Sequence, residues 1–581
     1  MPEQRLINTA RSADLVTTKV IINGAELSRT IDILSIVVEK EINRIPSARL
    51  VITDGDPATQ DFSVSNQELF VPGNEIEISA GYHFEEEVIF KGIIIKQNLK
   101  IRTDHSLLIV ECKDVLVKLT VGRKSKYFTE MKDSEIIEEI ISDYGIDKEI
   151  EPTDVQRKEL VQFNVTDWDF CIMRAQVNGK VCIANDGKLI VKSPGYDGDE
   201  VETVAFGATL LDFDAEMDAR TQLSGVTGYS WDYAAQELVE VEAAAPSVNL
   251  NGNIPSGDMA SVMNAGNIAL RSGGATPADE LQQWVDAKAL FSQLAKVRGR
   301  VKFQGIPAVK PDTVLKIEGV GDRFNGKVYV SGVRHQITEG NWTVDAQFGV
   351  EPRWFTETVN ISDLPAAGLN AAINGLQTGV VTQLESDPDG EDRILVKLPV
   401  VDNEVLGTWA RVSTLDAGEN RGSFFRPEIG DEVIVGFINA NPNDAVVLGM
   451  LNSSAKPAPL PASDDNHEKG FFTRSEMKLV FNDDKKSVIL ETPAGKKISV
   501  DEDAGVIQLE DENQNKFTLN SDGITIESGS DVIIKANGDV KIEGVNIEIK
   551  ASAQLKAEGS VGAELSSGAS TTVKGSIVQI N

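Results

Sequence analysis

The C-terminal region, residues 477–581, carries short apolar runs at a nearly regular spacing, and this repeat limits the possible folds more than any other feature. Eight runs begin 7 to 10 residues apart, at positions 488, 498, 507, 517, 524, 532, 540 and 547. Most of them alternate apolar and polar residues, as a strand with one buried face does. Turn sequences such as Ser521-Asp522-Gly523 separate the runs. The repeat predicts short strands stacked in regular succession.

Strands this short do not close a solenoid coil within one chain, because a single-chain coil with three faces needs longer repeats. Three chains wound together supply one strand each per face, place the apolar residues on a narrow axis and leave no open sheet edge. A narrow axis also suits a region with no aromatic residue after Phe517 and no proline after Pro493. We therefore expect a homotrimeric, triple-stranded, intertwined β-helix, a needle, over 477–581. A plain antiparallel sheet domain is the alternative, although Asn-Gly hairpin turns do not follow every run.

Two sets of residues in the needle are candidates for contacts between chains. The candidates for the trimer axis are Ile534, Val540, Ile542, Ile547 and Ile549. The candidates for a cap-binding tip are Ile577, Val578, Gln579, Ile580 and Asn581. A trimer would gather three such chain ends into one apolar platform with open strand ends, and exposed apolar surfaces of this kind usually mark a binding site.

The rest of the chain also predicts a mainly β fold. β-Branched runs bounded by turn signals indicate one β-barrel at about 15–120 and a second at about 200–350. An α/β insertion is expected at about 125–200, with helices that begin at Asp133 or Ser134 and at Thr166. An Ala/Gly/Ser-rich linker from about 240 precedes a helix that runs to about 298, with Thr276 as its N-cap. Together these segments form a hub over 1–368.

A second group of short strands follows the hub. Residues 369–454 have the size and turn spacing of a five-stranded OB-fold barrel. A proline-rich stretch, Pro457-Ala458-Pro459-Leu460-Pro461, lies within a linker expected at 455–476. The linker leaves too few residues between the barrel and the needle for any catalytic domain.

Charge and cysteine content exclude several classes of function. The formal net charge is −34 and the pI about 4.6, so the surface repels phosphate backbones and anionic lipids. We expect no nucleic-acid partner and no stable membrane association. Cys112, Cys171 and Cys182 form no C-x-x-C pair, which predicts buried thiols rather than a disulfide framework. The N-terminus shows no secretory signal, and no apolar stretch is long enough for a membrane-spanning helix.

Several motifs resemble the VgrG and phage baseplate-spike family. In the OB region these are Gly407-Thr408-Trp409-Ala410-Arg411-Val412, Phe424-Phe425-Arg426-Pro427-Glu428-Ile429-Gly430-Asp431 and Asn441-Pro442-Asn443-Asp444. In the hub they are Phe70-Val71-Pro72-Gly73-Asn74, Asp167-Trp168-Asp169-Phe170 and Gly332-Val333-Arg334-His335. The needle repeat resembles the family's triple-stranded needle, so the likeness spans nearly the whole chain.

The resemblance implies a structural spike of a contractile injection machine, such as a type VI secretion system or a phage-tail-like particle. Three hubs would seat a hexameric, Hcp-like tube protein, and a PAAR-type tip protein would cap the needle. Baseplate proteins and secreted effectors are the other implied partners. The protein would assemble in the bacterial cytoplasm and then be secreted or delivered into a target cell without a signal peptide.

No enzymatic, metal or cofactor site is expected. His335 has no acid or nucleophile pattern around it and is interpreted as a packing or hydrogen-bonding residue. The acids at 483–484 and 501–503 fall at turns, where Asp satisfies turn geometry, rather than in a glycosidase or calcium site. No His follows His467, so the His-x-His iron motif of some family needles is missing. The alternative functions are a spike with wall-degrading hydrolase activity and a trimeric receptor-binding fibre.

Overall fold

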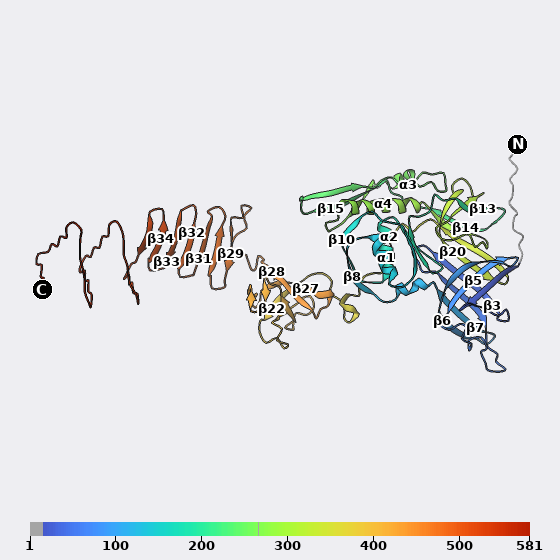
Figure 1. Ribbon diagram of the computed structural model, residues 1–581, viewed down its shortest axis with the longest axis horizontal. Coiled ribbons are helices and arrows are strands. Elements are labelled where there is room, and N and C mark those ends of the chain that lie inside the picture. The colour runs from blue at the N-terminus through green and yellow to red at the C-terminus, as the bar shows by residue number, and fades with distance from the viewer. Residues whose placement is uncertain (1–14, 265, 581) are drawn as a thin grey trace. The chain divides into compact units, whose positions relative to one another are not determined.

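The computed structural model describes residues 15–264 and 266–580, and the chain divides into two units. The first comprises the residues up to Ile373 together with Asn439–Pro442, and the second comprises Asn374–Ile438 and the residues from Asn443 onward. Strands predominate in both units (Figure 1). The mainly β fold predicted from the sequence is therefore correct.

A 13-stranded sheet is the largest sheet of the described part of the first unit. Its N-terminal strands are β1 Val16–Ile22, β2 Ala25–Glu26, β3 Ile33–Glu41, β4 Ser47–Thr53, β5 Glu75–Tyr82, β6 Glu85–Ile101 and β7 Ser106–Lys113. Its later strands are β13 Glu200–Ala205, β14 Leu210–Met217, β18 Val297–Gln304, β19 Val314–Glu318, β20 Gly326–Thr338 and β21 Asn341–Phe348. Eleven of them follow the order β14-β18-β21-β20-β3-β4-β7-β6-β5-β1-β2, while β19 pairs with β13 and β20.

The two barrels expected in the hub are two lobes of this one sheet. The long strand β20 pairs with β19 and β21 of the second lobe and also with β3 of the first, so it hydrogen-bonds both lobes into one sheet. Each lobe still has its own apolar core. Leu50, Ile78 and Phe90 are fully buried in the first, and Phe303 and Phe348 are buried in the second.

The α/β insertion lies between the two lobes in sequence. Its elements are η1 Val115–Thr120, β8 Lys124–Lys132, α1 Asp133–Ser142, β9 Asp147–Ile150, β10 Gln156–Val165, α2 Asp167–Val177, β11 Val181–Asn185 and β12 Lys188–Lys192. Thr166 is the N-cap of α2, as predicted, because its hydroxyl accepts a hydrogen bond from the Asp169 amide. The N-cap of α1 is Lys132 instead of Asp133 or Ser134.

The segment expected to be a linker from residue 240 contains regular structure. Its neighbourhood holds η2 Ala219–Thr221, β15 Gly225–Asp232, β16 Glu237–Glu242, α3 Ser256–Met263, β17 Asn267–Arg271 and α4 Ala278–Leu294. β17 pairs in parallel with β15. α4 packs so closely on β15 that a Cβ at Gly228 would lie 2.8 Å from Leu281 and Val285. Pro277, not Thr276, is the N-cap of α4. The hub ends with α5 Phe355–Thr358 and η3 Pro365–Gly368.

A closed five-stranded barrel opens the second unit. It contains β22 Gln377–Gln383, β23 Ile394–Lys397, β24 Thr408–Val412, β27 Glu432–Phe437 and β28 Ala445–Met450, which close in the order β22-β23-β24-β28-β27. The small hairpin β25 Ala417–Gly418 and β26 Arg421–Gly422 lies between β24 and β27 in the sequence, and η4 Ile438–Ala440 follows β27.

Seven antiparallel strands follow the barrel as a meander within one chain. They are β29 Glu468–Phe472, β30 Lys478–Asn482, β31 Ser487–Glu491, β32 Lys497–Asp501, β33 Val506–Glu510, β34 Lys516–Asn520 and β35 Gly523–Glu527. The meander begins inside the segment expected to be a linker up to 476. It also shows that hairpins form without Asn-Gly turns, because left-handed backbone at Lys486, Gly495, Gly505 and Gln514 reverses the chain. The alternative of an antiparallel sheet therefore describes 468–527 in the single chain.

Candidate assembly surfaces

The meander has one apolar face whose residues line up across all seven strands. The strand register places two rows on this face. The first row is Phe471, Leu479, Leu490, Ile498, Leu509, Phe517 and Ile526, and the second is Phe481, Val488, Val500, Ile507, Leu519 and Ile524. Nine of these thirteen side chains are 41–67% exposed in the single chain. Exposed apolar faces of this kind usually mark an interaction surface.

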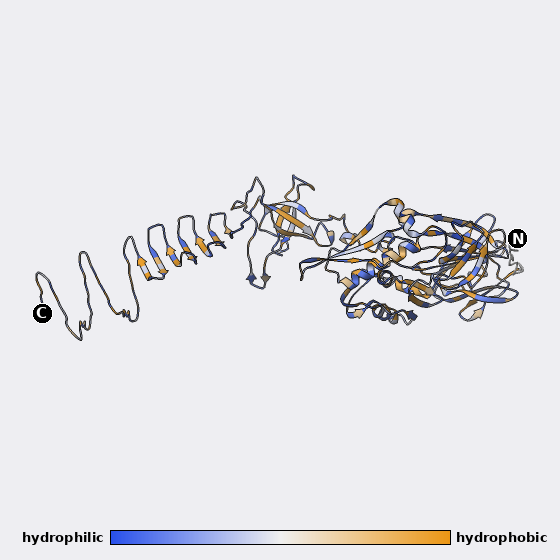
Figure 2. Cartoon of the chain, turned by 90° about the horizontal axis from the view of Figure 1, so that it is seen from above, coloured by the Kyte–Doolittle hydropathy of each residue, from blue (hydrophilic) through white to orange (hydrophobic). Residues whose placement is uncertain are grey.

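The opposite face of the meander is polar and carries a ladder of alternating charge. Cross-strand neighbours along it are Lys478, Glu491, Lys497, Glu510, Lys516 and Glu527, one from each strand from β30 to β35. Lys478 and Glu491 form an ion pair of 3.1 Å, and Glu510 lies 4.0 Å from both Lys497 and Lys516. Figure 2 shows hydrophobic and hydrophilic residues interleaved along these strands. This ladder was not predicted, although a Lys or Glu at one end of each apolar run was visible in the sequence.

The predicted axis candidates lie beyond the meander. The structure assigns neither helix nor strand to residues 528–580, although the apolar runs continue there. Ile534, Val540, Ile542, Ile547 and Ile549 are 53–72% exposed. Within a single chain they remain on the surface.

The predicted tip is equally exposed. Ile577 is 81% exposed, Val578 50% and Ile580 92%, and Gln579 is exposed as well. Asn581 lies outside the described residues. These side chains present an apolar surface at the end of the described chain.

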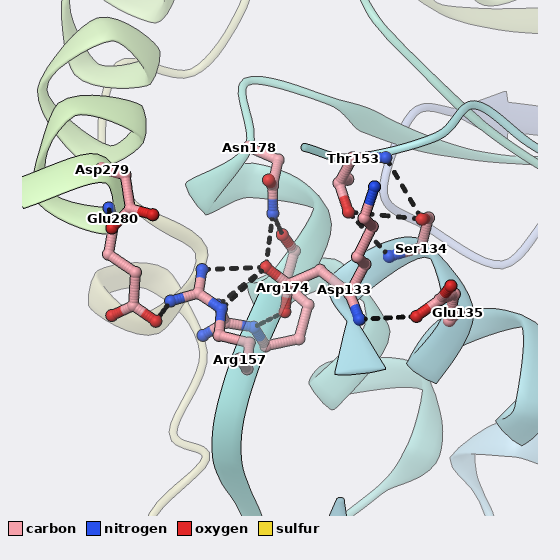
Figure 3. A network of polar contacts seen from close by, with 10 residues as sticks. Asp133, Ser134, Glu135, Thr153, Arg157, Arg174, Asn178, Asp279 and Glu280 are labelled. Carbon is pink, nitrogen blue, oxygen red and sulfur yellow. Dashed lines mark hydrogen bonds and ion pairs between the residues drawn. The ribbon is translucent and has the colours of Figure 1, made fainter. Parts of the chain in front are cut away.

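A buried ionic network joins the hub insertion to α4 (Figure 3). Asp133 is fully buried at the start of α1 and accepts hydrogen bonds from Arg157 at 2.9 Å and Arg174 at 2.7 Å. Asn178 donates a third, at 2.8 Å. Arg157 also pairs with Glu280 of α4. Burial by itself would raise the pKa of Asp133, but these donors outweigh burial and hold the pKa below its ordinary value.

His335 packs in the hub core, which is one of the two roles expected from the sequence. It lies on β20, is 2% exposed, and its ring centroid is 5.8 Å from that of Trp342. Burial lowers its pKa to about 3, with Lys40 and Lys310 contributing in the same direction. A histidine that stays neutral and enclosed in this way has no access to a substrate proton.

The turn acids and the three cysteines have structural roles. Asp483 lies at the turn after β30 and pairs with Lys469, and Asp501 accepts the Ala504 amide at the turn after β32. The three cysteines are free and buried, as predicted. Burial raises the pKa of Cys112 and of Cys182 to about 12, which keeps both thiols protonated and unreactive.

Over 15–264 and 266–580, no group of three or more His, Cys, Asp or Glu side chains is arranged to hold a metal ion. None of the helices in the same ranges is both long and apolar enough to cross a membrane.

Comparison with solved structures returns tail and spike proteins. A tail protein from Neisseria meningitidis aligns with 59% of this chain and 98% of its own, at 13% identity and a TM-score of 0.43. A chain of the Francisella PdpA–VgrG complex aligns over 89% of this chain and 80% of its own, at 9% identity and a TM-score of 0.38. An E. coli component of the type VI secretion system aligns over 74% of this chain and 100% of its own, at 13% identity and a TM-score of 0.37.

Sequence comparison returns named relatives and two family models. The type VI secretion system spike proteins VgrG1b and VgrG1a of Pseudomonas aeruginosa are each 26% identical over 201 residues, which is 32% of this chain. The match spans 27% of VgrG1b and 31% of VgrG1a, so under a third of either relative is covered. Residues 377–451 match the type VI secretion system/phage-baseplate injector OB domain, and residues 12–339, more than half of the chain, match the Alg8 N-terminal domain. The OB domain match and the VgrG relatives show what parts of this chain are similar to, and the model that covers more than half of it shows that the chain belongs to the Alg8 N-terminal domain family.

Proposed function

We propose that this protein is the trimeric central spike, hub plus needle, of a contractile injection machine, and that its role is structural. The observation that carries the proposal is the exposed apolar face of the meander, which directly follows an injector OB domain. An OB domain by itself is compatible with many functions. An apolar face that needs further chains to cover it, following an injector OB domain and a two-lobed hub, fits a spike better than either feature alone.

The apolar face of the meander supports the homotrimer. Three copies placed with these faces inward would form a three-sided prism with a dry axis and the Lys/Glu ladders outside. Burial of apolar surface stabilises by about 25 cal/mol per Å². Over this part of the needle each chain would supply one whole side of the prism, because its seven strands already pair with one another.

The intertwined part of the needle would begin after Glu527. Backbone N–H and C=O groups removed from water need hydrogen-bond partners. Residues 528–580 form no strand within the single chain, so strand pairing inside the chain does not supply these partners. Neighbouring copies would supply those partners. Ile534, Val540, Ile542, Ile547 and Ile549 would then turn to the axis, as their alternation with polar residues allows.

The hub supports the seating of a hexameric tube. Each hub has two lobes with separate cores, so three hubs would present six lobes, matching a ring of six Hcp-like subunits. A PAAR-type protein would cap the apolar tip. Baseplate proteins and secreted effectors are the remaining proposed partners, and the spike would leave the bacterial cytoplasm through the machine itself.

A structural role also fits the space between the barrel and the needle. The last barrel strand ends at Met450 and the meander begins at Glu468, which leaves no room there for a catalytic domain. Incubation of the purified protein with peptidoglycan tests this point. Release of soluble muropeptides would support the alternative of a wall-degrading hydrolase.

Assembly is the decisive test. Analytical ultracentrifugation of the full chain at micromolar concentration should show a trimer that persists in high salt, because apolar contacts rather than ion pairs hold it. Mixing that trimer with purified tube protein should yield a capped ring. A stable, folded monomer would overturn the needle model, and a trimer that ignores the tube ring would favour a receptor-binding fibre.

A further inference from the structure

One loop of the barrel reaches the first hairpin of the meander. We call residues 424–431 the collar loop, and β29 with β30 the first needle hairpin. The collar loop is anchored in the barrel. Arg426 donates to the Leu384 carbonyl at 3.1 Å and pairs with Asp392, and the Gly430 amide donates to the Val381 carbonyl at 2.7 Å.

The anchored loop contacts the hairpin through an aromatic stack and an ion pair. The rings of Phe425 and Phe471 lie 5.2 Å apart between centroids, at an angle of 12°. Arg474, in the turn between β29 and β30, pairs with Glu428 at 2.8 Å. The ion pair is exposed and contributes little, so the stack is the stronger of the two contacts.

The stack continues the apolar face of the meander toward the barrel. Phe471 is the first residue of the row that runs through Leu479 to Ile526. Phe425 stacks on Phe471, which stays 47% exposed, and so adds one further aromatic residue to the barrel end of that row. The neighbouring Phe424 takes no part, because its ring lies 5.3 Å from the Arg426 guanidinium instead.

The linker between barrel and meander returns to the same loop. Lys456 donates to the Gly430 carbonyl at 2.5 Å and to Asp431 at 3.0 Å. The proline-rich stretch 457–461 follows, and the first needle hairpin begins at Glu468. The collar loop therefore contacts the chain on both sides of this stretch.

We propose that the collar loop is a joint that couples the needle to the barrel by direct contact, and that the proline-rich stretch is only a covalent tether. A needle driven into a target is compressed. Even a semi-rigid proline-rich linker is a single exposed length of chain, which bears such a load less well than packed surfaces do. This mechanical role rests on the proposed function, whereas the contact itself is a property of one chain.

Cysteine cross-linking of the full chain tests the contact. Phe425→Cys with Phe471→Cys should be joined rapidly by a short bis-maleimide, and the product should migrate as a single chain in a denaturing gel. Phe424→Cys with Phe471→Cys is the matched control and should react much less. The native cysteines are buried and do not interfere. Equal reaction of the two pairs would overturn the joint. A product of twice the chain mass would also overturn it, while supporting association of copies.

Amide hydrogen exchange in the turn 473–477 distinguishes coupling through the collar loop from coupling through the proline-rich stretch. Phe425→Ala should speed amide exchange in the 473–477 turn about three- to tenfold, as expected from the loss of one aromatic pair. Phe424→Ala should leave the rate unchanged. Pro457, Pro459 and Pro461 changed together to Gly should also leave it unchanged, because the contact does not depend on a stiff linker. Faster exchange in the proline variant than in Phe425→Ala would assign the coupling to the linker and reject the joint.

Discussion

Asp133 shows how one side chain can hold several elements together. It stands at the first turn of α1, and its partners come from β10 and α2, while Arg157 extends the network to α4. Removal of this buried carboxylate leaves Arg174 without its ion-pair partner and Arg157 with Glu280 alone, and an uncompensated buried charge is costly. Substitution of Asp133 therefore tests how much this network contributes to the stability of the hub.

We predict that Asp133→Asn destabilises the hub by about 3–5 kcal/mol. The folded pKa of Asp133 lies below its unfolded value, so the carboxylate stabilises above about pH 4 and this contribution is lost as the pH falls through the folded pKa. Urea unfolding followed by tryptophan fluorescence measures both effects. Asp143→Asn, at the exposed end of the same helix, should cost less than about 0.5 kcal/mol. Similar losses in the two variants would contradict the role of the network.

His335 gives the hub a second form of acid sensitivity, in the same direction as that of Asp133 but at a higher pH. Its pKa falls from 6.5 to about 3 on burial, so the unfolded chain binds the proton first. Stability supplied by the neutral ring is complete above pH 6.5 and declines as the pH falls below that value. At pH 5 the loss relative to pH 7 should be about 2 kcal/mol.

We predict that His335→Leu removes this part of the pH dependence between pH 7 and 5. The measurement is the difference in unfolding free energy between the two pH values, for the wild type and the variant. Identical differences would show that His335 is accessible to protons in the folded protein.

At the scale of the element, a charged substitution should have different effects on the two faces of the meander. Ile498 and Ser499 are neighbours on β32 and point to opposite faces. An aspartate at Ile498 would place three carboxylates together in the proposed trimer axis, and each unpaired buried charge costs several kcal/mol.

Ile498→Asp should therefore reduce the yield of trimer strongly, while Ser499→Asp should leave it near the wild-type level. Size-exclusion chromatography with light scattering measures both. If both variants assemble equally well, the apolar face is not the surface between copies.

The Lys/Glu ladder predicts a charge-specific effect on the outer face. Glu510→Lys places three lysines side by side at 497, 510 and 516 and should cost about 1 kcal/mol at low salt. Reversal of all six ladder charges restores every opposite-charge neighbour and should recover most of that loss. Urea midpoints at low and high salt provide the comparison. A six-charge variant as unstable as the single one would mean that the ladder does not stabilise the sheet.

At the scale of the whole molecule, the predicted tip is apolar although its side chains Ile577, Val578 and Ile580 are exposed in the single chain. Deletion of residues 577–581 should leave the trimer folded, because the meander and the upstream runs hold it. The same deletion should abolish capture of a PAAR-type cap protein in a pull-down, since strand-end hydrogen bonds and apolar packing would both be lost. Unchanged capture by the truncated protein would place the cap elsewhere.

The sequence by itself determined the features that depend on neighbours within a few positions. Thr166 and Asp169 are three residues apart, and their hydrogen bond begins α2 as predicted. The alternation in 488–526 assigned side chains to two faces, because successive residues of a strand point in opposite directions. Isolated cysteines predicted free thiols. The OB motifs predicted the family to which the OB region belongs.

Tertiary structure decided the features that join distant residues. Alternation assigns faces but does not say whether a strand pairs within its chain or with a copy, so the meander was visible only in the structure. Non-glycine residues such as Lys486 and Gln514 adopt left-handed backbone there without a local signal. β20 unites two lobes through partners that lie far apart in the sequence. Asp133, Arg157 and Glu280 meet only because the fold brings their elements together, and no local spacing encodes that meeting.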